Sequence, residues 1–275
     1  MITPAPASTL PSWTQAQASK VRPTHAVGID IGGTSIKGGV VNTYTGQLAS
    51  DLASVPTPLP ATPDSVAVAI DYLVQGLERT FTGPSVMQLG LAVPAIMQHG
   101  VARSAANTSD AWIGLDVNNF MSEHLGRGVG AINDADAAGL AEVEFGAGQH
   151  CKGVVAVITL GTGIGSALIV DGKLVPNTEF GHLEINGQDA ELTTSAVARE
   201  RNDMSWPDYA RHLNRYLSHL EFLLSPDLFI IGGGISARST DFLPHLNLKT
   251  RAVPAQLQNS AGTIGAATHM LEPAW

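Results

Sequence analysis

Cysteine is almost absent from this chain of 275 residues, in which Cys151 is the single cysteine. An intrachain disulfide and a cysteine-based zinc site are therefore excluded. No apolar run is long enough to cross a membrane as a helix. Residues 1–24 have neither the basic start nor the apolar centre of a secretory signal peptide, so we expect a disordered tail and a cytoplasmic protein.

Basic residues are also scarce relative to acidic ones. The 15 Lys and Arg residues face 24 Asp and Glu residues, which gives a formal net charge of −9 at pH 7. An acidic chain is a poor general binder of nucleic acids and of anionic membranes. Neither is expected as a partner, and a polyanionic substrate would have to be held by local features of a site.

The sequence contains an internal repeat of one pattern. AVGIDIGGTSIKGGVVN at 26–42 and VAVITLGTGIGSALIVD at 155–171 each join two apolar runs through a Gly/Thr turn. A polar residue stands at the mouth of each turn, Asp30 in the first copy and Thr159 in the second. Tight turns between β-branched runs predict two antiparallel hairpins. Their repetition indicates one phosphate-handling unit used in duplicate.

The repeat divides the chain into two halves, each long enough for an α/β domain. We predict a tail at 1–24, a small N-terminal α/β domain at 25–133, a larger C-terminal α/β domain at 134–260, and a helix at 261–275 that packs back on the N-terminal domain. Strands are predicted at 26–31, 36–42, 87–93, 129–132, 154–160, 165–170 and 228–231, and helices at 64–80, 117–125, 135–145, 206–224 and 261–271. Strand–helix alternation after each hairpin predicts parallel neighbours, with a ligand in the cleft between the halves.

The two turns are candidate phosphate loops, because glycine lets backbone N–H groups approach phosphate oxygens and a threonine hydroxyl adds a donor. The candidates are Gly32, Gly33, Thr34 and the nearby Lys37 in the first copy, and Gly161, Thr162 and Gly163 in the second. Asp30 is a candidate ligand for Mg²⁺, directly or through water. A plain hairpin turn is the alternative for either motif taken alone.

A third glycine cluster, Gly232, Gly233 and Gly234, follows the apolar run LFII and precedes a predicted helix. The absence of side chains would let a flat ligand lie against the backbone, and a helix N-terminus favours anions. The simpler alternative is a strand-to-helix turn that needs positive φ.

Asn133 and Asp134 close one predicted strand and open the helix ADAAGLAEVEF. Asp134 is either an N-cap or a general base beside an amide that orients a hydroxyl substrate. One carboxylate that accepts the hydroxyl proton suffices for phosphoryl transfer to an alcohol, and the rest is positioning and electrostatics.

Further hydrogen-bonding groups follow the second hairpin, at Glu179, His182, Glu184 and Glu191. Such planar groups suit neighbouring sugar hydroxyls. A metal site is the alternative, because His182 and Glu184 would share one face of a strand, and a solvated acidic loop is another. Asn107 is a loop amide that either contacts the sugar or ends a turn.

The order of these motifs is more specific than any one of them. DIGGT, LGLAVP, NDADAA, LGTGIG, EFGH and IGGGI follow one another within residues 26–271. This succession resembles the ROK family of sugar kinases. PNTEFGHLEI at 176–185, ERNDMSWPDYA at 200–210 and VPAQLQNSAGTIGAA at 253–267 are similar to the polyphosphate glucokinase branch of that family.

The resemblance implies a two-domain actin-like, hexokinase-like fold built on ribonuclease-H-like cores, with a cleft between the domains. It also implies phosphoryl transfer from inorganic polyphosphate or ATP, with Mg²⁺, to the 6-hydroxyl of glucose, with mannose as a candidate second acceptor. Asp134 would be the catalytic base, and Asn107, Asn133, Asp134, Glu179, His182 and Glu191 would bind the sugar. Asp30, Gly32, Gly33, Thr34, Lys37, Gly161, Thr162, Gly163, Gly232, Gly233 and Gly234 would bind the donor.

One departure from the family pattern concerns zinc. Many members carry C-x-C-G-x-x-G-C after the G-H pair, whereas this chain reads GQDAELTTSA at 187–196. No zinc site is expected, and His182 keeps only the sugar role.

An ATP-only kinase for another hexose or an amino sugar stays an alternative, as does a non-catalytic sugar-binding regulator. The family's repressors need an N-terminal helix-turn-helix, which the Pro-rich tail does not provide. The chain is expected to be a monomer or a homodimer.

Overall fold

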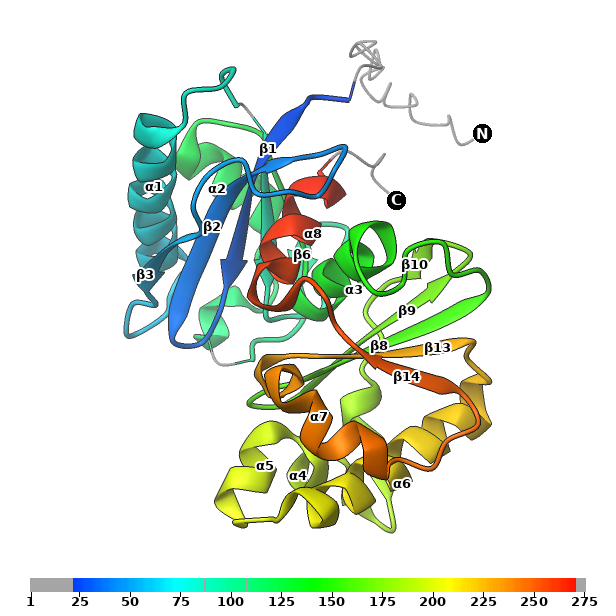
Figure 1. Ribbon diagram of the computed structural model, residues 1–275. Coiled ribbons are helices and arrows are strands. Elements are labelled where there is room, and N and C mark those ends of the chain that lie inside the picture. The colour runs from blue at the N-terminus through cyan, green and yellow to red at the C-terminus, as the bar shows by residue number, and fades with distance from the viewer. Residues whose placement is uncertain (1–21, 87, 107, 271–275) are drawn as a thin grey trace, which may run out of the picture.

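The computed structural model describes residues 22–86, 88–106 and 108–270. Asn107 and most of the expected tail lie outside the described residues. The described chain forms two five-stranded sheets, one in each half, with helices against both faces of each (Figure 1). In this part of the chain, no helix is both long and apolar enough to span a membrane.

The first sheet has the strand order β3-β2-β1-β4-β7. The predicted hairpin is present as β1 and β2, which pair antiparallel, whereas β4 and β7 add on in parallel. The strands are β1 (His25–Ile31), β2 (Ser35–Asn42), β3 (Ala53–Pro56), β4 (Leu89–Val93) and β7 (Val129–Asn133). The helices α1 (Pro63–Thr80) and α2 (Val117–Leu125) cover its outer face. Thr62 caps α1 by accepting from the Ser65 N–H.

The second sheet repeats this topology, with the order β10-β9-β8-β13-β14. The second hairpin, β8 and β9, is again antiparallel, and β13 and β14 are again parallel to it. Its strands are β8 (Val154–Leu160), β9 (Ile164–Val170), β10 (Lys173–Val175), β13 (Leu228–Gly232) and β14 (Arg251–Pro254). The long helix α6 (Trp206–Leu224) covers the outer face, next to the short helices α4 (Glu191–Thr194), α5 (Ala196–Arg201) and α7 (Ser239–Phe242).

Short elements complete the chain around these sheets. They are the two-residue strands β5 (Met97–Gln98), β6 (Val101–Ala102), β11 (Glu184–Ile185) and β12 (Gln188–Asp189), and the 3₁₀ turns η1 (Asp110–Trp112), η2 (Phe180–His182), η3 (Gly234–Arg238), η4 (Leu243–His245) and η5 (Gln258–Ser260). They follow strand ends and so shape the edge of each sheet.

Two Ala- and Gly-rich helices, α3 (Asp134–Phe145) and α8 (Ala261–His269), lie against each other between the sheets (Figure 1). Their small side chains allow close approach. A Cβ atom on Gly265 of α8 would lie 1.8 Å from the Ala137 carbonyl oxygen of α3. The Cβ atom of an alanine at Gly28 in β1 would lie equally close, 1.8 Å, to the Thr263 carbonyl oxygen of α8. The two halves are thus joined by a helix pair with no room for larger residues.

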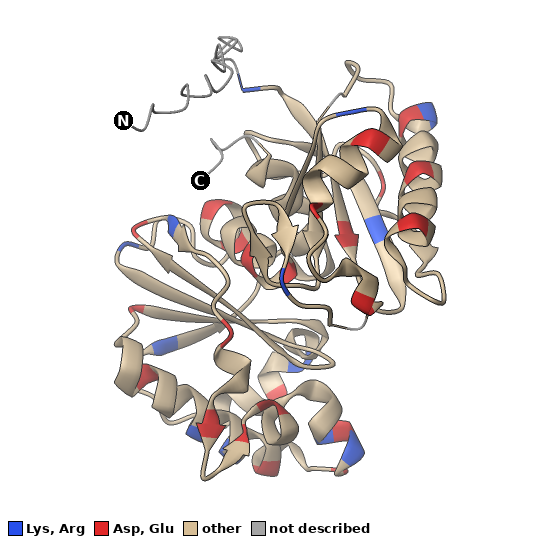
Figure 2. Cartoon of the chain, turned by 180° about the vertical axis from the view of Figure 1, so that it is seen from behind, with Lys and Arg blue, Asp and Glu red and all other residues tan. Residues whose placement is uncertain are grey.

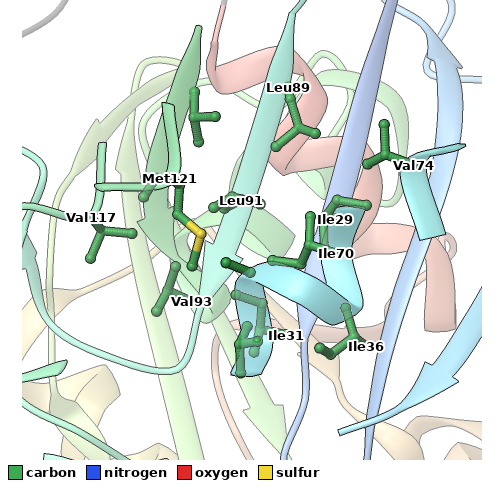
Figure 3. Close-up of a cluster of buried hydrophobic side chains, with 14 of the residues drawn as sticks. Ile29, Ile31, Ile36, Ile70, Val74, Leu89, Leu91, Val93, Val117 and Met121 are labelled. Atoms are coloured by element: carbon green, nitrogen blue, oxygen red, sulfur yellow. The ribbon is translucent and has the colours of Figure 1, made fainter. Parts of the chain in front are cut away.

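Alternation along β1 decides which residues face this helix pair. Val27, Ile29 and Ile31 point into the outer core with α1, where Figure 3 shows Ile29 and Ile31 among Ile70, Val74, Leu89 and Leu91. Gly28 and Asp30 therefore point the other way, toward α8. In β8, Val155 and Val157 likewise pack on the α3 side, so Thr159 shares their inward direction. Asp30 and Thr159 thus occupy matching places in the two copies.

All predicted strands and helices are present, with ends within two residues of the predicted ones where the structure describes them. The sequence analysis missed the edge strands β3, β10 and β14 and the helices α4, α5 and α7. These elements have six residues or fewer. A segment so short contains too few repeats of either hydrophobic period to stand out from a loop.

Candidate functional site

A cavity of about 190 Å³ opens between the two sheets, at the ends of β1, β8 and β13. Both halves of the chain line it. From the first half come Asp30 and Lys37, and from the second come Asp134, Thr159 and the three glycines after β13. The remaining wall consists of Ala135, Ala138, Glu142, Val157, Ala255, Gln258, Asn259, Ala261 and Gly262. The cleft expected between the halves is therefore present.

The first hairpin contributes a carboxylate and an ammonium group to this cavity. Asp30 lies directly opposite Lys37 in the β1–β2 register, so the two side chains share one face. Burial raises the pKa of Asp30, and the positive charge of Lys37 opposes that rise. Gly32, Gly33 and Thr34 form the turn beyond this pair and do not line the cavity.

The second hairpin has the same layout. Thr159 lines the cavity, whereas Gly161, Thr162 and Gly163 form the turn beyond it. Glu191 closes this turn from outside, because its Oε2 accepts from the Ile164 N–H at 2.9 Å. A Cβ atom on Gly163 would lie 2.3 Å from that oxygen, so glycine is needed for the contact. Glu191 therefore orders the turn and is not part of the cavity wall.

The third glycine cluster lines the cavity along its backbone. Gly233 has a φ of 78°, and a Cβ atom there would lie 2.3 Å from the Leu160 carbonyl oxygen. The strand-to-helix turn with positive φ is therefore present, and it also presents bare backbone to the cavity. The strand-to-helix turn is thus confirmed, and ligand binding by the same three residues stays a prediction.

Asn133, and not Asp134, is the N-cap of α3. Its Oδ1 accepts from the N–H groups of Ala135 at 2.9 Å and Asp136 at 3.0 Å. Its Nδ2 donates to the Ala95 carbonyl at 3.1 Å. The N-cap alternative for Asp134 is therefore wrong, because the preceding amide already satisfies the free N–H groups of the helix. Asp134 is left as the first helical residue, with its carboxylate on the cavity wall.

The Asp134 carboxyl has an unusual proton affinity. Its pKa is raised to about 7, first by burial and then by the negative charge of Asp30, while the Ala135 N–H opposes the rise. Glu179 adds a further negative charge in the same direction. A carboxyl that titrates near neutral pH is suited to accept and return a proton at a substrate hydroxyl.

One of the predicted sugar-binding residues, Glu179, lies close enough to the Asp134 carboxyl to raise its pKa. Burial raises the pKa of Glu179, with the charge of His182 opposing it. His182 is largely exposed, and its Nδ1 lies 3.0 Å from Asp189 Oδ2, a hydrogen bond that raises the pKa of the imidazole. Among the residues predicted to bind sugar, Asp134 alone is found in the cavity wall, within the part of the chain that the structure describes.

The metal alternative for this segment required His182 and Glu184 on one strand face. That expectation is wrong, because His182 lies in η2 and only Glu184 lies in β11. Within residues 22–86, 88–106 and 108–270, no three His, Cys, Asp or Glu side chains come close enough together to hold a metal ion. The strand β11 is only two residues long because η2 precedes it and the chain turns at Asn186, which has positive φ.

Two residues that support the site were not predicted. Glu142 of α3 accepts from the N–H groups of Gln256 at 3.1 Å and Leu257 at 2.7 Å, which fixes the segment that supplies Gln258 to the cavity. Asp136 is almost fully buried, and its Oδ2 accepts from the Asn177 N–H at 2.8 Å. One sequence signal could have identified both residues, because Asp136 and Glu142 are acidic residues inside an Ala- and Gly-rich helix that is buried on several faces.

The Asp30 carboxylate fits a divalent cation of the Mg²⁺ type. It is a hard oxygen ligand, and a cation would stabilise a buried carboxylate whose charged form is disfavoured by desolvation. Mg²⁺ is commonly held by one or two carboxylates together with substrate phosphates and water. The cavity offers Asp30 for this purpose.

Comparison with known proteins places this architecture and this cavity in a family. The ROK family model matches residues 26–195. Polyphosphate glucokinase of Mycobacterium tuberculosis is 47% identical over 244 residues, which cover 88% of this chain and 90% of that protein. The chain belongs to the ROK family.

Solved structures agree with this assignment. Inorganic polyphosphate/ATP-glucomannokinase from Arthrobacter sp. strain KM is 55% identical, with a TM-score of 0.86 over 90% of this chain and 98% of that one. A ROK family glucokinase from Streptomyces griseus, in complex with glucose and AMPPNP, is 26% identical, with a TM-score of 0.75 over 88% of this chain and 98% of that one. The two sheets and the cavity between them thus form the actin-like, hexokinase-like fold of ROK kinases.

Proposed function

We propose that this protein transfers a phosphoryl group from inorganic polyphosphate or ATP to the 6-hydroxyl of glucose, and that mannose is a second acceptor. The observation that carries the proposal is the Asp134 carboxyl, with a pKa of about 7, on the wall of a cavity that both hairpins border. The names of the M. tuberculosis and Arthrobacter relatives support the donors and both sugars.

In the proposed reaction, Asp134 accepts the proton of the sugar hydroxyl while the hydroxyl oxygen attacks the terminal phosphorus of the donor. The new O–P bond forms as the bond from that phosphorus to the donor's bridging oxygen breaks. The donor leaves one phosphoryl group shorter, and the proton stays on the Asp134 carboxyl until solvent removes it. Lys37 lies on the same wall and stabilises negative charge on the transferred group.

Mg²⁺ would be held by Asp30 together with donor phosphate oxygens, and it would supply charge neutralisation at those oxygens. Asp30 and Lys37 place one negative and one positive group side by side on the first hairpin. We assign the donor to the backbone of Gly232, Gly233 and Gly234, which line the same cavity. The turns at Gly32–Thr34 and Gly161–Gly163 lie beyond the cavity wall, and we propose that they contact the donor there.

The sugar is proposed to lie on the Glu179 side of Asp134. Glu179 and Asp134 are close enough for the charge of Glu179 to raise the pKa of Asp134. Glu179 and His182 would accept and donate hydrogen bonds to neighbouring hydroxyls. Asn133 has one N–H left for a sugar oxygen after its bond to Ala95. Glu191 would act on the sugar only through the second hairpin, which it orders.

The test compares Asp134→Asn with Asp51→Asn, a control at an exposed carboxyl. Turnover is measured on glucose, mannose and an amino sugar, with polyphosphate and ATP as separate donors, and glucose binding is measured by calorimetry. We expect Asp134→Asn to lose turnover by roughly 10³-fold or more while it still binds glucose. Near-normal turnover in this variant would remove the base assignment.

The donor and sugar panel separates the alternatives. Turnover with ATP alone would indicate an ATP-dependent hexose or amino-sugar kinase, depending on the acceptor. Glucose binding without any phosphorylated sugar, with either donor, would indicate a sugar-binding regulator.

A further inference from the structure

Arg199 and Arg238 approach one indole, that of Trp206. The Arg199 guanidinium carbon lies 3.8 Å from the ring centroid, and the Arg238 guanidinium carbon lies 5.2 Å from it. Trp206 is itself fixed from below, because it stacks on the buried Phe242 with centroids 6.0 Å apart. We call Arg199, Trp206 and Arg238 the arginine–tryptophan platform. Its two guanidinium groups are both placed against one ordered ring.

Each arginine lies on a short segment next to a glycine turn that we assign to the donor. These turns are Gly161–Gly163 for Arg199 and Gly232–Gly234 for Arg238. α5 begins against the second hairpin, where the Val197 N–H donates to the Gly161 carbonyl at 3.2 Å, and Arg199 follows two residues later. η3 begins at Gly234 on the cavity wall and ends at Arg238. A 3₁₀ segment of this length extends about 8 Å. The platform therefore lies outside the cavity, beyond the wall assigned to the donor.

The charges on the platform are not balanced within the described residues. Arg238 pairs with Asp241 at 2.6 Å. Arg199 has no ion pair in this part of the chain, and its buried Nε has no hydrogen-bond partner there. Asp241 offsets the charge of Arg238, so the platform keeps one positive charge, that of Arg199, without an ion-pair partner in this part of the chain. Guanidinium presents a fork of N–H donors that matches phosphate oxygens.

Other basic side chains do not extend this site. Arg201 donates to the Leu192 carbonyl at 2.9 Å, which ties α5 to α4. Lys173 lies on the edge strand β10. Figure 2 shows Lys and Arg residues as separate segments of the chain, interspersed with acidic and uncharged segments. The positive groups that we assign to a polyanion are Lys37 inside the cavity and the platform outside it.

We propose that the platform binds the part of an inorganic polyphosphate chain that extends beyond the transferred phosphoryl group. The inference rests on the proposed function and deepens it by naming the second contact of that donor. A polyphosphate chain carries a negative charge on each phosphate along its length, whereas the nucleoside of ATP carries none. The platform should therefore favour long polyphosphate over tripolyphosphate and over ATP.

The experiment uses the full chain with Arg238→Gln, Arg199→Met and Arg199→Lys, and with Arg211→Gln as the control. Arg211 is an exposed arginine on α6 that also pairs with an aspartate, Asp208. At saturating glucose, KM is measured for long-chain polyphosphate, for tripolyphosphate and for ATP. We expect Arg238→Gln and Arg199→Met each to raise the KM for long-chain polyphosphate about tenfold, since each loses charge-assisted hydrogen bonds. The KM for ATP, the kcat with ATP and the control should change less than twofold.

Two further readouts make the result specific. Arg199→Lys keeps the charge and should recover part of the affinity for long-chain polyphosphate. Added salt should weaken long-chain polyphosphate binding less in the Met and Gln variants than in the wild type, because fewer ionic contacts are left to screen. If Arg199→Met unfolds after losing its contact with Trp206, Arg238→Gln, at an exposed residue, carries the test.

The outcomes that overturn the inference are distinct from failure of the proposed function. An equal rise of KM for ATP and for long-chain polyphosphate would show that the platform only orders the donor loops or holds the nucleotide. Unchanged KM values in both variants would show that it has no donor role. A wild-type protein that uses ATP but not polyphosphate would overturn the proposed donor and the platform's ligand together.

Discussion

Asn177 holds Met97 through both atoms of its side-chain amide. Its Oδ1 accepts from the Met97 N–H at 2.7 Å, and its Nδ2 donates to the Met97 carbonyl at 2.7 Å. Met97 belongs to β5 in the first half, whereas Asn177 follows β10 in the second half, two residues before Glu179. The Asn177 N–H is in turn bound by Asp136 of α3. The segment that carries Glu179 is therefore tied to both halves of the cleft.

Asn177→Ala should loosen that tie and weaken glucose binding. We expect the KM for glucose to rise about tenfold, since two partly buried hydrogen bonds of roughly 1 kcal/mol each position the Glu179 segment. The kcat should fall less. Asn186→Ala is the matched control, because φ is 58° at Asn177 and 57° at Asn186, so both substitutions carry the same left-handed backbone cost. Equal KM values in the two variants would show that the contact with Met97 does not position the sugar.

The pH dependence of turnover should report the Asp134 carboxyl. A general base acts when deprotonated, and the pKa of Asp134 is about 7, so kcat/KM for glucose should fall tenfold per pH unit below about pH 7 and level off above it. Asp30 raises the pKa of Asp134 through its negative charge. Asp30→Asn should therefore move the acidic limb of the residual activity to lower pH. A limb that stays at the same pH in Asp30→Asn would contradict the coupling of these two carboxyls.

Stability should also depend on pH through Asp136. Burial raises the pKa of this carboxyl from 3.8 to about 7, while the Asn177 N–H opposes the rise. Between these pH values the folded state binds more protons than the unfolded state, so this group lowers the free energy of unfolding as pH rises from about 4 to about 7. In Asp136→Asn, the free energy of unfolding should fall less between pH 5 and pH 8 than in the wild type. Urea unfolding at the two pH values measures the difference. An identical fall in both proteins would show that Asp136 has an ordinary pKa.

Much of the fold was predictable because its strongest signals are local. The β-branched runs on either side of a Gly/Thr turn predicted both hairpins, and period-two alternation then decides that Asp30 and Thr159 face the cavity. The Asn133–Asp134 pair was recognised at the right place. Which of the two residues is the N-cap was not predictable, because the sequence allows either of two adjacent polar residues to adopt the backbone geometry of an N-cap.

The supporting contacts of the site were beyond sequence reasoning for a different reason. The tie from Asn177 to Met97 spans 80 residues, and the contacts from Glu142 to residues 256 and 257 span 114 and 115. No local period encodes such pairs. The sequence also does not reveal how far a turn projects. Gly32, Gly33 and Thr34 therefore looked equivalent to Asp30, whereas only Asp30 and Lys37 of this hairpin reach the cavity wall.

The close packing of α8 on the first sheet gives a prediction about stability alone. A Cβ atom at Gly90 in β4 would lie 1.8 Å from the Ala266 carbonyl oxygen of α8, a contact with backbone that no side-chain rotation relieves. Gly90→Ala should therefore lower the free energy of unfolding by about 3 kcal/mol. Gly128→Ala is the matched control, since nothing lies within 4 Å of a Cβ atom there, and its effect should stay within about 0.5 kcal/mol. Urea unfolding at one pH compares the two variants. A difference between them below about 1 kcal/mol would mean that α8 can move away from β4 at little cost, and the close helix–sheet contact would then not be what joins the halves.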